Sequence, residues 1–248
     1  MKNKVVDGKI LADERIYQPE LNIERPKEIF VFVGDRISAL DVGEHSEIID
    51  VGCASGSFLH YLRGRFPSAG LAGTDVSDVL VSRAQALIPD GRFFAATLDQ
   101  EDALPKTRYD VTCSIGVMCY FDDITLPLKN LVSSVKAGGT AIISTMINSD
   151  PIDIVARHRR SAPDGQGEWE IGWNIFSQQT YNHTLQSFGD HVSWRWHPVD
   201  MPFALEKKED PMRSWTIETE EKRFQLVNGA SQLINMQVLE ILVEKSAA

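Results

Sequence analysis

A short apolar run that ends in a glycine-bearing loop constrains the fold of this chain most strongly. Residues 47–51 read Glu-Ile-Ile-Asp-Val, and Gly-Cys-Ala-Ser-Gly follows them before an apolar-faced segment at 57–65. Gly52 gives the turn after a buried strand the backbone freedom that it needs. Gly56 lets a helix begin close to that strand, and the free amides of the first helical turn attract a polar or anionic group. The sequence therefore predicts a strand–loop–helix unit with a ligand against bare backbone.

Apolar runs and amphipathic segments continue to alternate after this unit. Ser77 is a natural N-cap for a second helix, and Gly138 is expected to stop a later helix over 126–136. Strands that alternate with such helices form βαβ units with right-handed crossovers. We therefore expect an α/β fold with a doubly wound, mostly parallel sheet of seven strands and helices on both faces. The expected strands are 47–51, 70–75, 92–96, 110–115, 140–145, 191–196 and 236–243, and the expected helices are 27–40, 57–65, 78–87, 126–136 and 178–188.

The length of the chain and the positions of its prolines and glycines predict a single domain over 1–248. The 248 residues suffice for one large domain, whereas two full domains would be crowded. Residues 1–26 are polar and indicate an N-terminal arm. The segment 147–177 is interrupted by prolines and glycines, so we expect an inserted lid, and alternation within 201–228 suggests an inserted hairpin. The ligand-binding core is expected at 47–146.

The overall charge and composition exclude several classes of function. The net charge of −10 disfavours nucleic acid as a partner, because proteins that bind phosphates usually carry positive charge. No apolar run approaches the roughly 20 residues of a membrane span, and no secretory signal is visible. Three cysteines are too few for a disulfide framework and fit a cytoplasmic protein. No ligand spacing suggests a metal site.

Two acidic residues indicate which ligand the loop would take. Asp75 ends the second expected strand, where a carboxylate can accept hydrogen bonds from both ribose hydroxyls of an adenosine. Asp50 lies at the loop itself and would repel the pyrophosphate of a dinucleotide. An ammonium group would be attracted there instead. The pair therefore favours S-adenosylmethionine over NAD, and a nicotinamide-dependent oxidoreductase is the weaker alternative.

These residues resemble the class I S-adenosylmethionine-dependent methyltransferases of the small-molecule type. The resemblance covers about 47–146 and, loosely, the last strand. Ala54 departs from the family pattern, because the middle glycine of the first motif is expected there. The later motifs match in order at Asp75-Val76, 96–99, 109–117 and 131–140. The family implies a Rossmann-like sheet with a C-terminal antiparallel strand, S-adenosyl-L-methionine as cofactor and S-adenosyl-L-homocysteine as product.

The resemblance also implies roles by position. Backbone of the first motif would line the methionine end, Asp75 and Val76 would hold ribose and adenine, and Leu98 and Asp99 would contact adenine. Tyr17 in the arm could close over the cofactor. The cofactor-binding residues expected in this way are Tyr17, Asp50, Gly52, Cys53, Ala54, Gly56, Asp75, Val76, Leu98, Asp99, Ser114, Ile115, Gly116 and Tyr120.

The reaction implied is an in-line displacement, for which a hydroxyl acceptor usually needs a general base. The candidate catalytic residues are His158, His183 and Tyr120. The arginines around His158 could hold an anionic group, and Trp169 and Trp173 could stack on a flat ring or sugar.

We expect a small polar acceptor, first of all a hydroxyl of a sugar, a sugar nucleotide or another metabolite. No Asn/Asp-Pro-Pro-aromatic tetrapeptide follows the fourth strand, which disfavours methylation of base or glutamine amino groups, and the charge disfavours RNA. Methylation at N or C of a natural product, methylation of a carboxylic acid, and a non-catalytic S-adenosylmethionine-binding module are the alternatives. The protein is expected to be a monomer or a homodimer.

Overall fold

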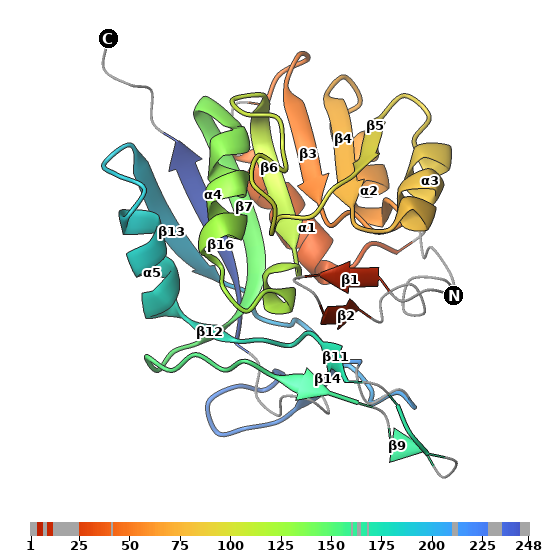
Figure 1. The fold of residues 1–248 in the computed structure, drawn as a ribbon, viewed down its shortest axis with the longest axis vertical. Helices are drawn as coiled ribbons and strands as arrows, with labels where there is room; N and C mark the ends of the chain where they lie inside the picture. The colour runs from red at the N-terminus through yellow and green to blue at the C-terminus, as the bar shows by residue number, and fades with distance from the viewer. Residues whose placement is uncertain are drawn as a thin grey trace.

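A single twisted sheet forms the centre of the computed structural model (Figure 1). The structure describes residues 4–6, 9–11, 25–40, 42–159, 161–162, 165–167, 169–209, 213–227 and 235–243. Tyr17 lies outside the described residues. The strands of the sheet are β3 (Glu47–Val51), β4 (Gly70–Asp75), β5 (Arg92–Ala95), β6 (Tyr109–Ile115), β7 (Val135–Asn148), β13 (Val192–Pro198) and β16 (Asn235–Val243).

The strand order is β13-β16-β7-β6-β3-β4-β5, and the five strands from β7 to β5 are parallel. The C-terminal strand β16 lies antiparallel between β7 and β13. A two-residue strand, β12 (Phe176–Ser177), also pairs with the end of β7. The predicted doubly wound, mostly parallel seven-strand path with an antiparallel C-terminal strand is therefore confirmed. Its connections reverse direction between β3 and β6, where such sheets bind ligands at the carboxyl ends of the strands.

Helices cover both faces of the sheet, as the sequence predicted (Figure 1). Phe30, Phe58 and Ala84 bring the first three helices onto one face. Leu131 and Leu185 bring the last two onto the other face. The helices are α1 (Glu28–Ser38), α2 (Ser57–Arg65), α3 (Asp78–Leu87), α4 (Thr125–Ser134) and α5 (Gln178–Gln186), with a short 3₁₀ helix, η2 (Met118–Tyr120).

The helix ends agree with the sequence at one position and differ at another. Ser77 caps α3, since its side chain accepts from the amide of Leu80. The predicted stop at Gly138 is wrong, because α4 ends at Ser134 and β7 begins at Val135. Val135 is buried and pairs with Tyr109, and the glycines lie in an irregularity of the β6–β7 pairing. A Cβ atom at Gly139 would lie 2.5 Å from the carbonyl oxygen of Asp110.

The segments predicted as insertions gather beyond the carboxyl ends of the parallel strands (Figure 1). Described residues of 147–177 form short strands, and β14 (Trp215–Ile217) and β15 (Gln225–Val227) pair as the hairpin expected within 201–228. The domain boundaries stay predictions. The short strands are β1 (Lys4–Val6), β2 (Lys9–Leu11), β8 (Arg157–His158), β9 (Ser161–Ala162), β10 (Gly165–Gln166), β11 (Glu170–Ile171), β14 (Trp215–Ile217) and β15 (Gln225–Val227).

Two kinds of feature are absent from the described residues. No helix among them has the length and apolar character that crossing a membrane requires. They also contain no group of three or more His, Cys, Asp or Glu side chains arranged to hold a metal ion.

Candidate active site

The loop after β3 lies over the carboxyl end of β4. The amides of Gly52 and Cys53 both donate to the carbonyl oxygen of Thr74, over 2.7 and 2.9 Å. Gly52 has a φ of 82°, and a Cβ atom there would lie 2.3 Å from Cγ2 of Val117. Any side chain at Gly52 would therefore strain the left-handed backbone and collide with Val117. Glycine is required here by the protein itself, as well as by any ligand against the backbone.

Two further loop residues have positive φ angles, 48° at Ala54 and 87° at Gly56. A Cβ atom at Gly56 would lie 3.0 Å from Cβ of Ala84, on α3. Gly56 therefore lets α2 begin against α3, whereas the sequence pattern predicted close approach to the strand. Ala54 stands where the family pattern has glycine, and this conformation costs an L-residue about 1 kcal/mol or more.

The carboxylate of Asp75 is oriented by two backbone amides. Its Oδ2 accepts from the amide of Ala54 over 3.0 Å, and its Oδ1 accepts from the amide of Ser77 over 2.9 Å. These bonds fix the carboxylate at the end of β4 and tie it to the glycine-bearing loop. Each carboxylate oxygen can accept more than one hydrogen bond.

Asp50 is the most perturbed carboxyl group of the site. Its side chain is 2% exposed, and its Oδ1 has no hydrogen-bond partner among the described residues. Burial, and then the negative charge of Asp75, raises the pKa of Asp50 to about 8. An unpartnered buried carboxyl oxygen is costly unless a donor or a cation reaches it. The ammonium group of a methionine moiety fits this requirement.

A cavity of about 700 Å³ opens beside the loop. Asp50 and Gly52 line one side, and Thr145 and Met146 at the carboxyl half of β7 line another. A second cavity of about 60 Å³ adjoins it, and both are lined by Gly116 and by Gly52, Ala54, Ile115 and Tyr120. A Cβ atom at Gly116 would meet nothing within 4 Å, so its backbone borders open space. The two cavities form a continuous candidate site at the switch point of the sheet.

Most of the residues predicted to bind the cofactor meet at these two cavities. Residues that line at least one of them are Asp50, Gly52, Cys53, Ala54, Asp75, Val76, Leu98, Ile115, Gly116 and Tyr120. Gly56 does not line either cavity, for the packing reason given above. Ser114 is fully buried within β6, and Asp99 accepts from the hydroxyl of Thr97 over 2.5 Å rather than facing either cavity.

The structure brings only one of the three candidate catalytic residues to the cavities. Tyr120 lines both of them. His158 lines neither cavity, and its Nε2 lies 3.6 Å from Oε2 of Glu170. His183 is exposed on α5, whose buried side chains, Tyr181 and Leu185, face the core. His183 therefore does not belong to this site, and a catalytic role for His158 has no support from its position.

Two of the arginines predicted to hold an anion, Arg157 and Arg159, have protein partners instead, and Arg160 lies outside the described residues. Arg157 donates to both carboxylate oxygens of Asp122, over 2.7 and 2.5 Å. The guanidinium of Arg159 lies 4.6 Å from the ring centroid of Trp169, which is exposed and outside the cavity lining. Trp173, in contrast, lines the larger cavity.

Sequence reasoning missed a group of cations around the larger cavity. Lys27 precedes α1, and Lys207, Lys208 and Arg213 come from the hairpin insertion, where Glu206 is the accompanying acid. Surrounding protein atoms, and then the charge of Arg213, lower the pKa of Lys27. These residues are about 180 positions apart in the chain and follow no local motif, so nothing in the sequence pattern indicated that they meet.

Comparison with known sequences identifies a family. The model described as a methyltransferase domain matches residues 22–192, which is more than half of the chain. Over 106 residues the chain is 29% identical to malonyl-[acyl-carrier protein] O-methyltransferase from Acetivibrio thermocellus, covering 43% of this chain and 38% of that protein. Over 112 residues it is 30% identical to trans-aconitate 2-methyltransferase from Rhodopseudomonas palustris, covering 45% and 43%. The matches thus span less than half the length of either curated relative.

Solved structures show the same fold at low sequence identity. An S-adenosylmethionine-dependent methyltransferase from Clostridium acetobutylicum aligns with a TM-score of 0.58 and 12% identity, over 94% of this chain and 98% of that one. Another from Mesorhizobium loti aligns with a TM-score of 0.55 and 17% identity, over 89% and 100%. On the family match and this fold, the chain belongs to the methyltransferase domain family, among the class I S-adenosylmethionine-dependent methyltransferases.

Proposed function

We propose that this protein transfers a methyl group from S-adenosylmethionine to the carboxylate of a small molecule. The observation that carries the proposal is the lining of the cavity beside the glycine-bearing loop. On the loop side lies Asp50, whose buried Oδ1 has no hydrogen-bond partner among the described residues, and the lining also contains several lysine and arginine side chains. The first feature suits the ammonium group of the cofactor. The second suits a negatively charged acceptor.

The residues at the loop divide the cofactor between the two cavities. Asp50 would pair with the ammonium group, while the backbone at Gly52 and Gly116 would lie against the ligand. Asp75 and Leu98 line the smaller cavity, where ribose and adenine would sit. When bound, S-adenosylmethionine supplies a methyl group on a positively charged sulfur, which departs as a neutral thioether.

The chemistry of the larger cavity favours a carboxylate over a hydroxyl. A carboxylate is already ionised at neutral pH and needs no base, whereas a hydroxyl must lose a proton. Among the described residues that line this cavity there is no histidine. Lys27 and Arg213 can instead hold a carboxylate by charge-assisted hydrogen bonds and orient its oxygen toward the methyl group. This favours the carboxylic acid alternative over the sugar hydroxyl expected from the sequence.

The names of the two relatives described above agree with this choice. One is named for malonyl groups on an acyl-carrier protein, and the other for trans-aconitate. Both names describe acceptors that carry carboxylates. The matches cover less than half of this chain, so the acceptor assignment rests mainly on the cations of the cavity.

An acceptor panel tests the proposal. Purified protein is incubated with S-adenosylmethionine and malonate, succinate, trans-aconitate, glucose or a sugar nucleotide, and release of S-adenosylhomocysteine is followed. We expect turnover with at least one acid and a methyl ester in the mass spectrum of the product. Turnover with the sugars alone would refute the carboxylate assignment, and binding of the cofactor without turnover of any acceptor would favour a non-catalytic binding module.

Two variants then test the cations with the acid that turns over. Lys27→Ala and Arg213→Ala should each raise KM for that acid by about 10- to 100-fold, since each removes a charged hydrogen bond worth roughly 1.5–3 kcal/mol. Lys106→Ala is the matched control, because Lys106 pairs with Asp102 on the exposed surface and lines neither cavity of the candidate site. Unchanged KM in both test variants would contradict the proposed acceptor position.

A further inference from the structure

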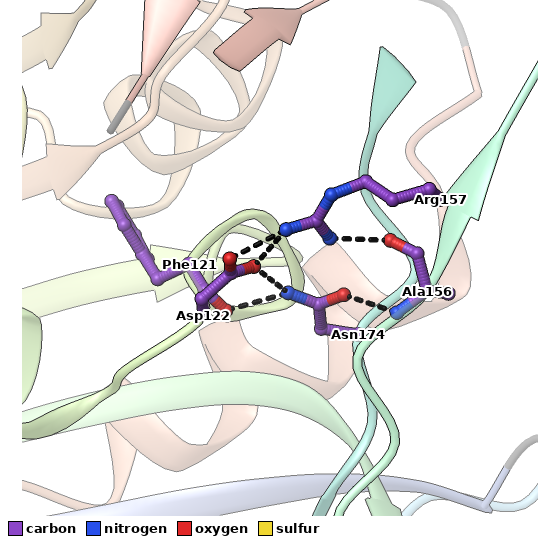
Figure 2. A network of polar contacts seen from close by, with 5 residues as sticks. All are labelled: Phe121, Asp122, Ala156, Arg157 and Asn174. Carbon is purple, nitrogen blue, oxygen red and sulfur yellow. Dashed lines mark hydrogen bonds and ion pairs between the residues drawn. The ribbon is translucent and has the colours of Figure 1, made fainter. Parts of the chain in front are cut away.

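A polar network joins the lid segment to the loop after η2. The side chain of Asn174 is 1% exposed. Its Nδ2 donates to the carbonyl oxygen of Phe121 over 2.7 Å and to Asp122 over 3.1 Å, and its Oδ1 accepts from the amide of Ala156 over 2.8 Å. Figure 2 shows Asn174 and Arg157 converging on the Asp122 carboxylate from the same side. Side chains that are far apart in the sequence therefore hold together the loop at 121–122, residues 156–157 and residue 174.

The residue before Asn174 lies in an unusual conformation. Trp173 has a φ of 67°, which is costly for a bulky aromatic residue and persists only where its surroundings enforce it. On its C-terminal side, the amide of Asn174 donates to the carbonyl oxygen of Cys119 over 3.0 Å, and Ile175 pairs with Ile154 in both directions. The backbone on one side of Trp173 is thus fixed by main-chain and side-chain bonds together.

Trp173 lies where the larger cavity meets a buried hydrophobic cluster. It packs against a buried cluster of Cys119, Met146, Ile175 and Leu226, in which side chains of η2, β7 and the hairpin insertion meet. Trp173 lines the larger cavity and is not among the residues that line the smaller one. The proposed function places the acceptor in this larger cavity, beside the methionine part of the cofactor, so Trp173 lines the cavity that the acceptor would enter.

We propose that Trp173 is the wall that limits the size of the acceptor, and that Asn174, with Asp122 and Arg157, is the network that positions it. The assignment of this wall to the acceptor rests on the proposed function, whereas the positioning of Trp173 does not. Asn174, Asp122 and Arg157 are positioning residues, since none of these three lines either cavity. The strain at Trp173 is sustained because the network fixes the backbone that follows it.

The positioning is tested without any acceptor. The protein is labelled with 5-fluorotryptophan, its five tryptophans are observed by fluorine NMR, and the Trp173 resonance is assigned by its loss in Trp173→Phe. In Asn174→Ala the Trp173 resonance should shift or broaden. Asn182→Ala is the matched control, because Asn182 accepts from the indoles of Trp194 and Trp196, remote from the network. That control should move the Trp194 and Trp196 resonances and leave Trp173 in place.

Asp122→Asn provides a second variant if Asn174→Ala does not fold. It keeps the shape of the side chain and removes the ion pair with Arg157, so it should also move the Trp173 resonance. A Trp173 resonance unchanged in every folded variant of the network would overturn the positioning role, whatever the enzyme methylates.

The acceptor role is tested with succinate and phenylsuccinate as probes, S-adenosylmethionine being held at saturation. Trp173→Ala should raise kcat/KM for phenylsuccinate relative to succinate by at least tenfold. Asn174→Ala should raise KM for succinate at least tenfold, while the affinity for S-adenosylhomocysteine stays within threefold. An unchanged ratio in Trp173→Ala would refute the size limit. If neither acid turns over in the wild type, the size limit is refuted for these acids. The acceptor panel then decides the proposed function, and the NMR result decides the positioning.

Discussion

Replacing Asp50 with asparagine should stabilise the free protein at alkaline pH and weaken the cofactor complex. The pKa of Asp50 is about 8 in the folded chain, because burial and Asp75 disfavour its charge. In the unfolded chain it is near 4, so the unfolded state ionises first and the folded state loses stability as pH rises from about 4 to about 8. The difference between the two pKa values sets an upper limit of about 6 kcal/mol on this loss. The amide of the Asp50→Asn variant has nearly the same shape and no charge, so the variant would not lose this stability as pH rises.

Folding favours the protonated form of Asp50, whereas cofactor binding should favour the ionised form. An ammonium group beside Asp50 favours the ionised carboxylate, so binding below pH 8 should release close to one proton. The affinity of the wild type should therefore increase by up to about tenfold per pH unit between pH 6 and 7.5. The neighbouring thiols of Cys53 and Cys113 have pKa values raised by burial and stay neutral in this range, so they add no proton of their own.

The assays are thermal unfolding at pH 5 and pH 8, and calorimetric titration with S-adenosylhomocysteine in two buffers of different ionisation enthalpy. Asp50→Asn should unfold at a higher temperature than the wild type at pH 8, and the gap should narrow toward pH 5. Its affinity at pH 7.5 should fall by about 10- to 100-fold, the loss of a charged hydrogen bond, with no proton released. Proton release that is absent from the wild type or unchanged in the variant would refute this reasoning.

Three other substitutions test the loop and its neighbours. Ala54→Gly should raise the free energy of unfolding by about 0.5–1 kcal/mol in a denaturant titration, because the φ of 48° suits glycine; no gain would mean that the strain is relieved elsewhere. Gly52→Ala should abolish S-adenosylhomocysteine binding in a folded protein, since its Cβ collides with Val117; retained affinity would contradict the loop geometry. Asp75→Ala should weaken the same binding by about 1–3 kcal/mol, measured by calorimetry, and unchanged affinity would remove Asp75 from the site.

The parts of the fold set by local chemistry could be predicted from the sequence. The glycine-bearing loop and the Ser77 cap depend on residues within a few positions of each other, and the structure has both. His183 could also have been excluded in this way. Tyr181 and Leu185 are four positions apart and share the buried face of α5, which leaves His183 on the outside.

The rest of the site depends on contacts between distant segments. The predicted stop at Gly138 was wrong because pairing of Val135 with Tyr109 outweighs the local preference for a helix end at glycine. Lys27 and Arg213 meet only after the hairpin insertion folds over the cavity. Arg157 looked free to bind an anion because its partner, Asp122, lies 35 positions earlier in the chain.

The central claim, that the glycine-bearing loop binds S-adenosylmethionine, is tested most directly by calorimetric titration of the wild type and Gly52→Ala. The titrants are S-adenosylmethionine, S-adenosylhomocysteine and NAD. We predict that the wild type binds both adenosyl ligands and not NAD, and that Gly52→Ala, although folded, binds none of them. Binding of NAD alone, or binding of S-adenosylhomocysteine that is unaffected by Gly52→Ala, would contradict the claim.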